Sequence, residues 1–166
     1  CDGGQMVYLS TSLGGSSSKK VLSDGFDWTS LASSLGPQLT VGDLLHNDTR
    51  RAADAKAHED RLLALAAQYN QIRQAWKGPI RVVSAFCPEP FNRQVCGKEN
   101  SLHAVGMALD LVPLDGDIDH FHNWLSKRWS GGLGHGVSKG SVHIDTRCAG
   151  HFSSRANLKP VILWTY

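Results

Sequence analysis

The segment Ser-Leu-His-Ala-Val-Gly-Met-Ala-Leu-Asp, residues 101–110, decides how the rest of the chain is interpreted. It holds an imidazole at His103 and a carboxylate at Asp110, and metal ions accept both as ligands. Gly106 lies between them and permits a sharp bend of the backbone. From Met107 onward the residues are apolar apart from Asp110, and a carboxylate inside a buried strand is costly unless a partner compensates it. A metal ion is such a partner.

A second segment, Val-His-Ile-Asp at residues 142–145, alternates apolar and polar side chains. This alternation predicts a strand with His143 and Asp145 on one face. Each of these side chains, taken singly, is typical of an ordinary structural residue. Together, His103, Asp110 and His143 give three protein ligands and leave a fourth position for water, which is the pattern of catalytic Zn²⁺.

These residues carry a family resemblance. The spacing Ser101-x-His103-x-x-Gly106-x-Ala108-x-Asp110, followed by His143-x-Asp145, resembles the M15 peptidases, and the likeness runs from about Thr40 to about Arg147. M15 peptidases are zinc D-Ala-D-Ala carboxypeptidases and L-Ala-D-Glu endopeptidases that cut peptidoglycan peptides, and the hedgehog signalling domain shares their metal scaffold. The resemblance implies a peptidoglycan stem peptide as substrate, and a location in the cell envelope, outside the cytoplasm, or in a phage particle.

The chain departs from the family pattern where a general base is expected. Several M15 members carry an acid shortly before the last histidine ligand, but here Gly140 stands three residues before His143. Asp145 is our candidate for the base, and the alternative is that it orients His143. His135 follows a glycine-rich segment and is our candidate donor to a developing oxyanion, with an ordinary loop histidine as the alternative.

A second departure concerns substrate binding. Related sequences carry an arginine at the end of the first strand, where this chain has Cys87. Arg93 and Arg147 are the candidates to supply the missing cation, because a guanidinium grips a carboxylate bidentately. Ser101, the first residue of the motif, is assigned with them to substrate binding. Without such a cation, the resemblance is compatible with a catalytically silent, metal-holding structural or cell-wall-binding module inside a larger assembly.

The composition fits a globular protein. The 166 residues are 41% hydrophobic and 19% charged, and the net charge of +2 gives no reason to expect nucleic acid as a partner. No apolar run reaches the length of a transmembrane helix. The chain begins with Cys1, as a mature bacterial lipoprotein with a lipid anchor does, and as an arbitrary fragment boundary also allows.

Four cysteines suggest an oxidising compartment. We expect a local disulfide between Cys87 and Cys96 and a second one between Cys1 and Cys148. Four reduced thiols are the alternative interpretation.

Residues 1–38 are predicted to form an N-terminal arm and linker, because residues 1–20 are rich in Gly and Ser, and residues 39–166 the M15-like domain. Apolar periodicity predicts helices over 52–76, 88–95 and 118–129, and strands over 80–86, 107–112 and 142–146. Residues 161–164 are a further strand or a docked tail. The expected fold is α+β: a small, mostly antiparallel sheet with helices packed on one face and the zinc site on the sheet.

Overall fold

The computed structural model describes residues 26–95 and 97–166. The first 25 residues of the predicted arm therefore lie outside the described part. The rest of the arm packs on the domain, because Trp28 and Leu39 belong to one buried apolar cluster. No helix in the described part is long and apolar enough to cross a membrane.

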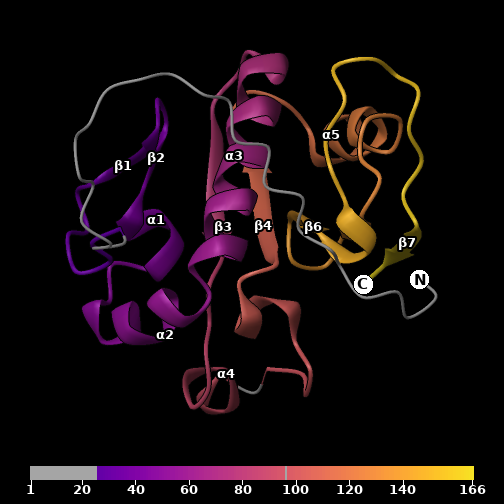
Figure 1. The fold of residues 1–166 in the computed structure, drawn as a ribbon. Helices are drawn as coiled ribbons and strands as arrows, with labels where there is room; N and C mark the ends of the chain where they lie inside the picture. The colour runs from indigo at the N-terminus through magenta and orange to yellow at the C-terminus, as the bar shows by residue number, and fades with distance from the viewer. Residues whose placement is uncertain (1–25, 96) are drawn as a thin grey trace.

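The fold is α+β, as predicted, and its centre is a five-stranded sheet (Figure 1). In spatial order its strands are β3 (Ile80–Ser84), β4 (Ala108–Pro113), β6 (Ser141–Asp145), β5 (Gly132–Gly136) and β7 (Ile162–Thr165). Neighbouring strands are antiparallel except β7, which runs parallel to β5. A separate two-stranded sheet joins β1 (Ser34–Gly36) to β2 (Leu39–Thr40).

The described residues also form five α-helices and three short 3₁₀ turns. The helices are α1 (Val41–Leu45), α2 (Ala52–Ala57), α3 (Glu59–Trp76), α4 (Phe91–Gln94) and α5 (Ile118–Leu125). The 3₁₀ turns are η1 (Thr49–Arg51), η2 (Leu102–Val105) and η3 (Arg147–Ala149).

The two faces of the sheet have different roles. Leu109 and Leu111 of β4, with Val142 and Ile144 of β6, are fully buried in the apolar cluster that includes α3 and α5. Because side chains alternate along a strand, the residues between them face the other side. Helices therefore cover one face and leave the opposite face to the polar residues of the two motifs.

Several expected elements differ from the structure. The helix predicted over 118–129 ends at Leu125, and the helix predicted over 88–95 covers only Phe91–Gln94. The single helix predicted over 52–76 is divided at His58, whose backbone leaves the helical region (φ −115°, ψ 20°) and whose ring packs edge-on against Phe86. The segment 132–136, expected only as a glycine-rich stretch, is strand β5. For residues 161–164 a strand or a docked tail was predicted, and residues 162–165 form a strand.

The expected Cys87–Cys96 disulfide is wrong, because Cys87 is a free thiol. The backbone N–H of Cys87 donates to the His103 carbonyl at 3.0 Å, which holds the strand end against η2. A short sequence separation permits a disulfide but does not bring two sulfur atoms together. The second expected pair involves Cys1, which lies outside the described residues, so that pairing stays a prediction.

Candidate metal centre

Three elements bring His103, Asp110 and His143 together. Strands β4 and β6 pair so that Asp110 stands directly opposite His143. The turn η2 ends at Gly106, whose positive φ of 74° is a conformation that glycine adopts readily. A side chain at that position would also crowd Leu62 of α3, at 3.0 Å. This tight turn folds His103 back over the start of β4.

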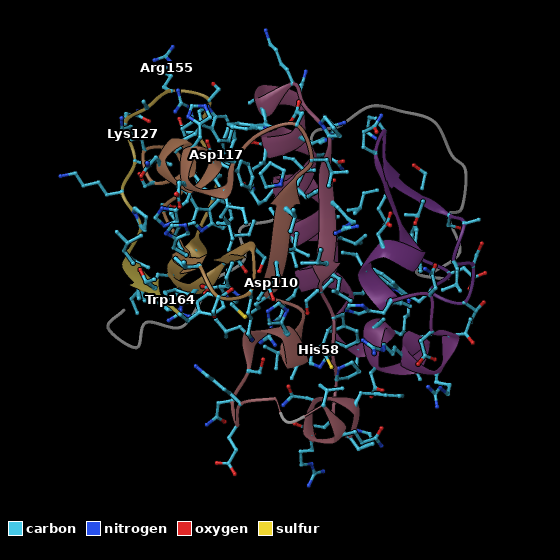
Figure 2. The ribbon with its side chains drawn as sticks, turned by 180° about the vertical axis from the view of Figure 1, so that it is seen from behind. His58, Asp110, Asp117, Lys127, Arg155 and Trp164 are labelled. Atoms are coloured by element: carbon cyan, nitrogen blue, oxygen red, sulfur yellow. The ribbon has the colours of Figure 1, made fainter. Side chains whose placement is uncertain are left out.

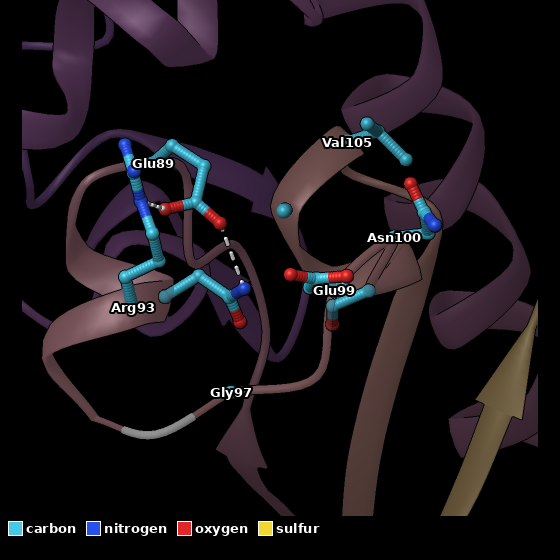
Figure 3. A pocket seen from close by; sticks show the side chains of 9 residues that line it. Glu89, Arg93, Gly97, Glu99, Asn100 and Val105 are labelled. Carbon is cyan, nitrogen blue, oxygen red and sulfur yellow. Dashed lines mark hydrogen bonds and ion pairs between the residues drawn. The ribbon is translucent and has the colours of Figure 1, made fainter.

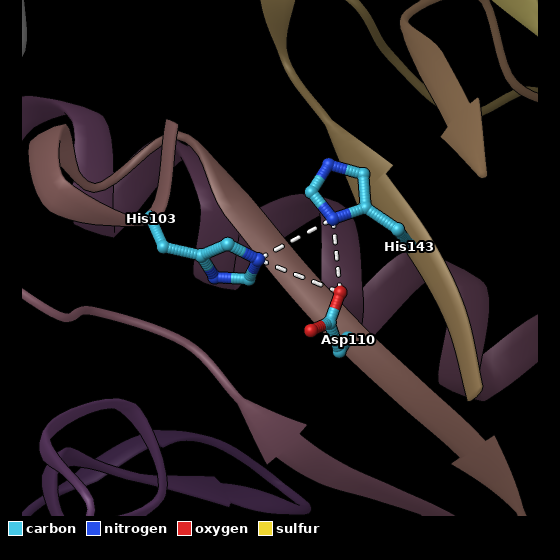
Figure 4. Close-up of side chains that lie close together, drawn as sticks. All are labelled: His103, Asp110 and His143. Atoms are coloured by element: carbon cyan, nitrogen blue, oxygen red, sulfur yellow. Dashed lines mark hydrogen bonds and ion pairs between the residues drawn. The ribbon is translucent and has the colours of Figure 1, made fainter. Parts of the chain in front are cut away.

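The three side chains converge on one point (Figure 4). Asp110 Oδ1 lies 2.9 Å from His143 Nδ1 and 3.4 Å from His103 Nε2, and the two nitrogens are 3.3 Å apart. Three ligand atoms bound to one tetrahedral zinc at ~2.1 Å would be roughly 3.4 Å from one another. The spacing therefore fits a shared metal ion.

The outer partners of the two histidines fix which nitrogen carries the proton. His103 Nδ1 lies 2.8 Å from the Ala85 carbonyl, which can only accept, so Nδ1 is the protonated nitrogen. His143 Nε2 lies 3.1 Å from the carboxylate of Asp145 and is protonated for the same reason. The nitrogens left for the centre, His103 Nε2 and His143 Nδ1, both carry lone pairs.

Two lone pairs and a carboxylate oxygen therefore face one another with no hydrogen between them. This arrangement is repulsive unless a cation lies between the three atoms or an imidazole takes up a proton. Burial raises the pKa of Asp110, but His103 and His143 outweigh it and hold that pKa well below its usual range. Burial lowers the pKa of His143, but Asp110 and Asp145 outweigh it and raise the pKa. The cluster favours positive charge, as a metal site does.

Asp145 lies behind His143, next to the nitrogen that faces away from Asp110. Its side chain is fully buried and also accepts two hydrogen bonds from the Arg147 guanidinium, both at 2.7 Å. The backbone N–H groups of Gly132 and Arg147 donate to the same carboxylate at 3.2 Å. Burial raises the pKa of Asp145, but His143 and Arg147 outweigh it and lower it to about 2. This surrounding favours the orienting role over that of a base.

The other two candidates for substrate binding lie together, away from Arg147. Arg93 and Ser101 line a pocket of about 530 Å³ that none of the three metal-ligand candidates lines (Figure 3). Arg93 Nε lies 2.9 Å from Glu89 Oε2 in an exposed ion pair. Arg93 and Arg147 each therefore already hold a carboxylate of this chain.

The expected role of His135 at the metal does not fit the geometry. His135 pairs with Val142 across β5 and β6, and residues directly opposite share a face. Val142 belongs to the helix-covered core, on the face opposite His143. There His135 stacks on the His122 ring of α5 at 4.4 Å and lies 2.8 Å from Asp119 Oδ1. Alternation along 132–136 would have shown this, had the segment been recognised as a strand.

Three further groups at the site were not found from the sequence. The Ala85 carbonyl orients His103, and no sequence signal marks a backbone group. His46, at the end of α1, accepts the Ala85 N–H at 3.2 Å. The Trp164 ring lies 5.2 Å from the His143 ring. In Figure 2, Asp110 lies near the middle of the molecule with Trp164 to its left, and Asp117 lies above both.

The sheet of this α+β fold carries a convergent His/Asp/His set on its uncovered face, and these ligand types could hold a metal ion. A family model described as Peptidase M15 matches residues 37–145, which is more than half of the chain. The chain therefore belongs to the M15 peptidase family. M15 peptidases are in general metal-dependent, and the described residues provide a site that could hold the ion. The comparison with curated proteins gives no significant match.

Proposed function

We propose that this protein is a zinc peptidase that cleaves peptidoglycan stem peptides, as a D,D-carboxypeptidase or an endopeptidase. The observation that carries the proposal is the convergence of His103 Nε2, His143 Nδ1 and Asp110 Oδ1, with both imidazole protons bound elsewhere. Membership of the M15 family supports the peptidase reaction. The sequence resemblance to cell-wall enzymes supports the substrate.

Zinc is the ion that the donor set suits best, because two imidazole nitrogens and one carboxylate oxygen are a common ligand set of catalytic zinc. When bound, zinc would supply Lewis-acid chemistry, polarising the scissile carbonyl and making water a better nucleophile near neutral pH. The contribution of this chain is to hold the ligands in place. Ala85 and Asp145 fix the two imidazole tautomers, and Arg147 keeps Asp145 ionised.

Substrate recognition is assigned to the surroundings of the motif. Ser101 and Arg93 line the pocket beside η2, and Arg147 flanks His143 through Asp145. A substrate carboxylate would have to compete with Glu89 for Arg93. The Glu89–Arg93 ion pair is exposed and therefore weak, so this competition is possible. We also propose a location outside the cytoplasm or in a phage particle, as part of a larger assembly.

The second candidate function is a catalytically silent M15 module that holds metal and binds the cell wall. It is favoured by the engagement of both arginines with carboxylates of the chain, together with Gly140 and Cys87 at the two departures from the family pattern.

Incubation with purified peptidoglycan, followed by mass analysis of the released fragments, separates the two functions. The peptidase releases stem-peptide fragments in the presence of zinc, and a chelator abolishes the release. The silent module sediments with peptidoglycan but releases nothing under either condition.

A further inference from the structure

Strand β5 presents an empty face on the side of the metal centre. Gly132, Gly134 and Gly136 alternate along it, so no side chain projects there. A Cβ atom at Gly134 would lie 2.8 Å from the Trp164 ring and 2.9 Å from the Tyr166 ring. A Cβ atom at Gly136 would lie 3.0 Å from the Tyr166 hydroxyl oxygen. The two rings therefore lie over β5, in space that only glycine leaves free.

The rings reach across β5 to the strand that carries His143. The register places Gly134 opposite His143 and Gly136 opposite Ser141. The Trp164 ring, which stacks on Tyr166 at 6.4 Å, contacts the His143 ring at 5.2 Å. Trp164 and Tyr166 thus form an aromatic wall on one side of the metal centre, and Tyr166 is partly exposed.

The hydroxyl group of Tyr166 lies within electrostatic reach of the metal ligands. Burial raises its pKa, the Asp110 carboxylate raises it further, and a hydrogen bond with the Ser141 side chain lowers it by less. Tyr166 therefore keeps its proton at neutral pH and can donate a hydrogen bond. It lies beside Ser141, next to Gly140, where several M15 members carry an acid and this chain does not.

Two of the other donors near the centre are already engaged. His103 Nδ1 is bound to the Ala85 carbonyl, and the Arg147 guanidinium is bound to Asp145. Peptide hydrolysis develops negative charge on the carbonyl oxygen, and a donor aimed at that oxygen stabilises the transition state. The Tyr166 hydroxyl lies on this face beside the Ser141 side chain and carries a proton that it can donate.

We propose that Tyr166 is a catalytic residue of this site: its hydroxyl donates a hydrogen bond to the scissile carbonyl oxygen as that oxygen becomes negative. Trp164 is the wall against which the bound peptide packs. The inference rests on the proposed peptidase function and names a residue beyond the segment 37–145 that the family model matches.

The test is Tyr166→Phe, which keeps the ring and removes the hydroxyl. We expect kcat on a D-Ala-D-Ala stem peptide to fall ~10–10³-fold, in the range found for loss of an oxyanion donor, while KM and zinc content change little. Tyr69→Phe is the matched control, because Tyr69 donates to the Ile80 carbonyl in the core at 2.8 Å. It should lower thermal stability and leave kcat unchanged. An unchanged kcat in Tyr166→Phe would overturn the proposal.

A binding measurement separates this proposal from the proposed function. The zinc-loaded wild type and Tyr166→Phe are titrated calorimetrically with a phosphinate analogue of D-Ala-D-Ala, whose charged oxygen resembles the developing oxyanion. We expect the variant to bind the analogue at least ~10-fold more weakly than the wild type. This difference is expected whether or not the wild type cleaves stem peptides. An inactive wild type that shows this difference refutes the peptidase reaction and retains the Tyr166 contact. Equal binding, or no binding by either protein, would overturn the proposal.

Discussion

Asp145 is surrounded by hydrogen-bond donors that stabilise its ionised carboxylate. It is fully buried, it accepts hydrogen bonds from His143, Gly132 and Arg147, and its pKa is lowered to about 2. A general base needs a free oxygen near the substrate, whereas a group that orients a metal ligand needs firm partners of its own. The geometry around Asp145 therefore favours a positioning role at the metal centre over the role of a base.

We expect Asp145→Asn to weaken zinc binding ~10–100-fold, because an outer partner of a ligand histidine is lost. Competition with a chromophoric chelator measures this affinity. Asp119→Asn, on the other side of the sheet, is the control and should bind zinc as the wild type does. Full zinc affinity combined with lost peptide cleavage would show that Asp145 is a base after all.

His46 links pH to the stability of the same region. Burial lowers its pKa, Arg51 and His103 lower it further, and its neutral Nε2 accepts the Ala85 N–H. The pKa of His46 in the folded protein lies below its value of ~6.5 in the unfolded chain. The contribution of neutral His46 to the free energy of unfolding is therefore complete above pH ~6.5. It is lost as the pH falls from there through the lower folded pKa.

We compare metal-free wild type with metal-free His46→Gln, in which the glutamine keeps a hydrogen-bond acceptor but does not titrate in this range. Between pH 8 and pH 5.5, the free energy of unfolding should fall further in the wild type than in the variant. Urea denaturation at the two pH values gives the comparison. Equal losses in both proteins would mean that His46 does not contribute to the pH dependence.

At the scale of elements, β5 joins β6 to the edge strand β7. Its alternating glycines leave room for the Asp145 carboxylate and for the rings of Trp164 and Tyr166. We expect Gly134→Ala to lower the free energy of unfolding by ~1–3 kcal/mol, because the new methyl group overpacks against the Trp164 ring.

Denaturant unfolding measures this change, and Gly116→Ala is the matched control. A Cβ atom at Gly116 meets a single neighbour, Trp76, at 3.3 Å. If Gly134→Ala is as stable as the control, the rings of Trp164 and Tyr166 do not lie across β5.

The sequence predicted the elements whose pattern is apolar and regular, namely β3, β4, β6, α3 and α5. It did not predict β5, because three glycines in five residues resemble a loop, and their meaning depends on β7, nearly thirty residues later. It did not predict the break at His58 either, since the apolar stripe continues through it and the break reflects packing on Phe86. Local sequence patterns do not show contacts between residues that are far apart in the sequence.

At the scale of the whole molecule, the ligand motif was recognisable because residue type and spacing carry it. The assignments around it were less accurate because they depend on pairing across the sheet. His135 lies near His143 in sequence but on the opposite face, while Tyr166 is distant in sequence and lies across β5 from Ser141. The proton positions that make the centre attractive to a cation depend on Ala85, a backbone carbonyl outside any motif.

Zinc content is the most direct measure of the central claim, that His103, Asp110 and His143 hold one metal ion. Wild type, Asp110→Asn and the control Asp119→Asn are loaded with zinc, dialysed and analysed by inductively coupled plasma mass spectrometry. We predict about one zinc per chain in wild type and control, and well below a tenth of that in Asp110→Asn, since a three-ligand site loses its only anionic ligand. Zinc retained equally by all three proteins, or by none, would contradict the account.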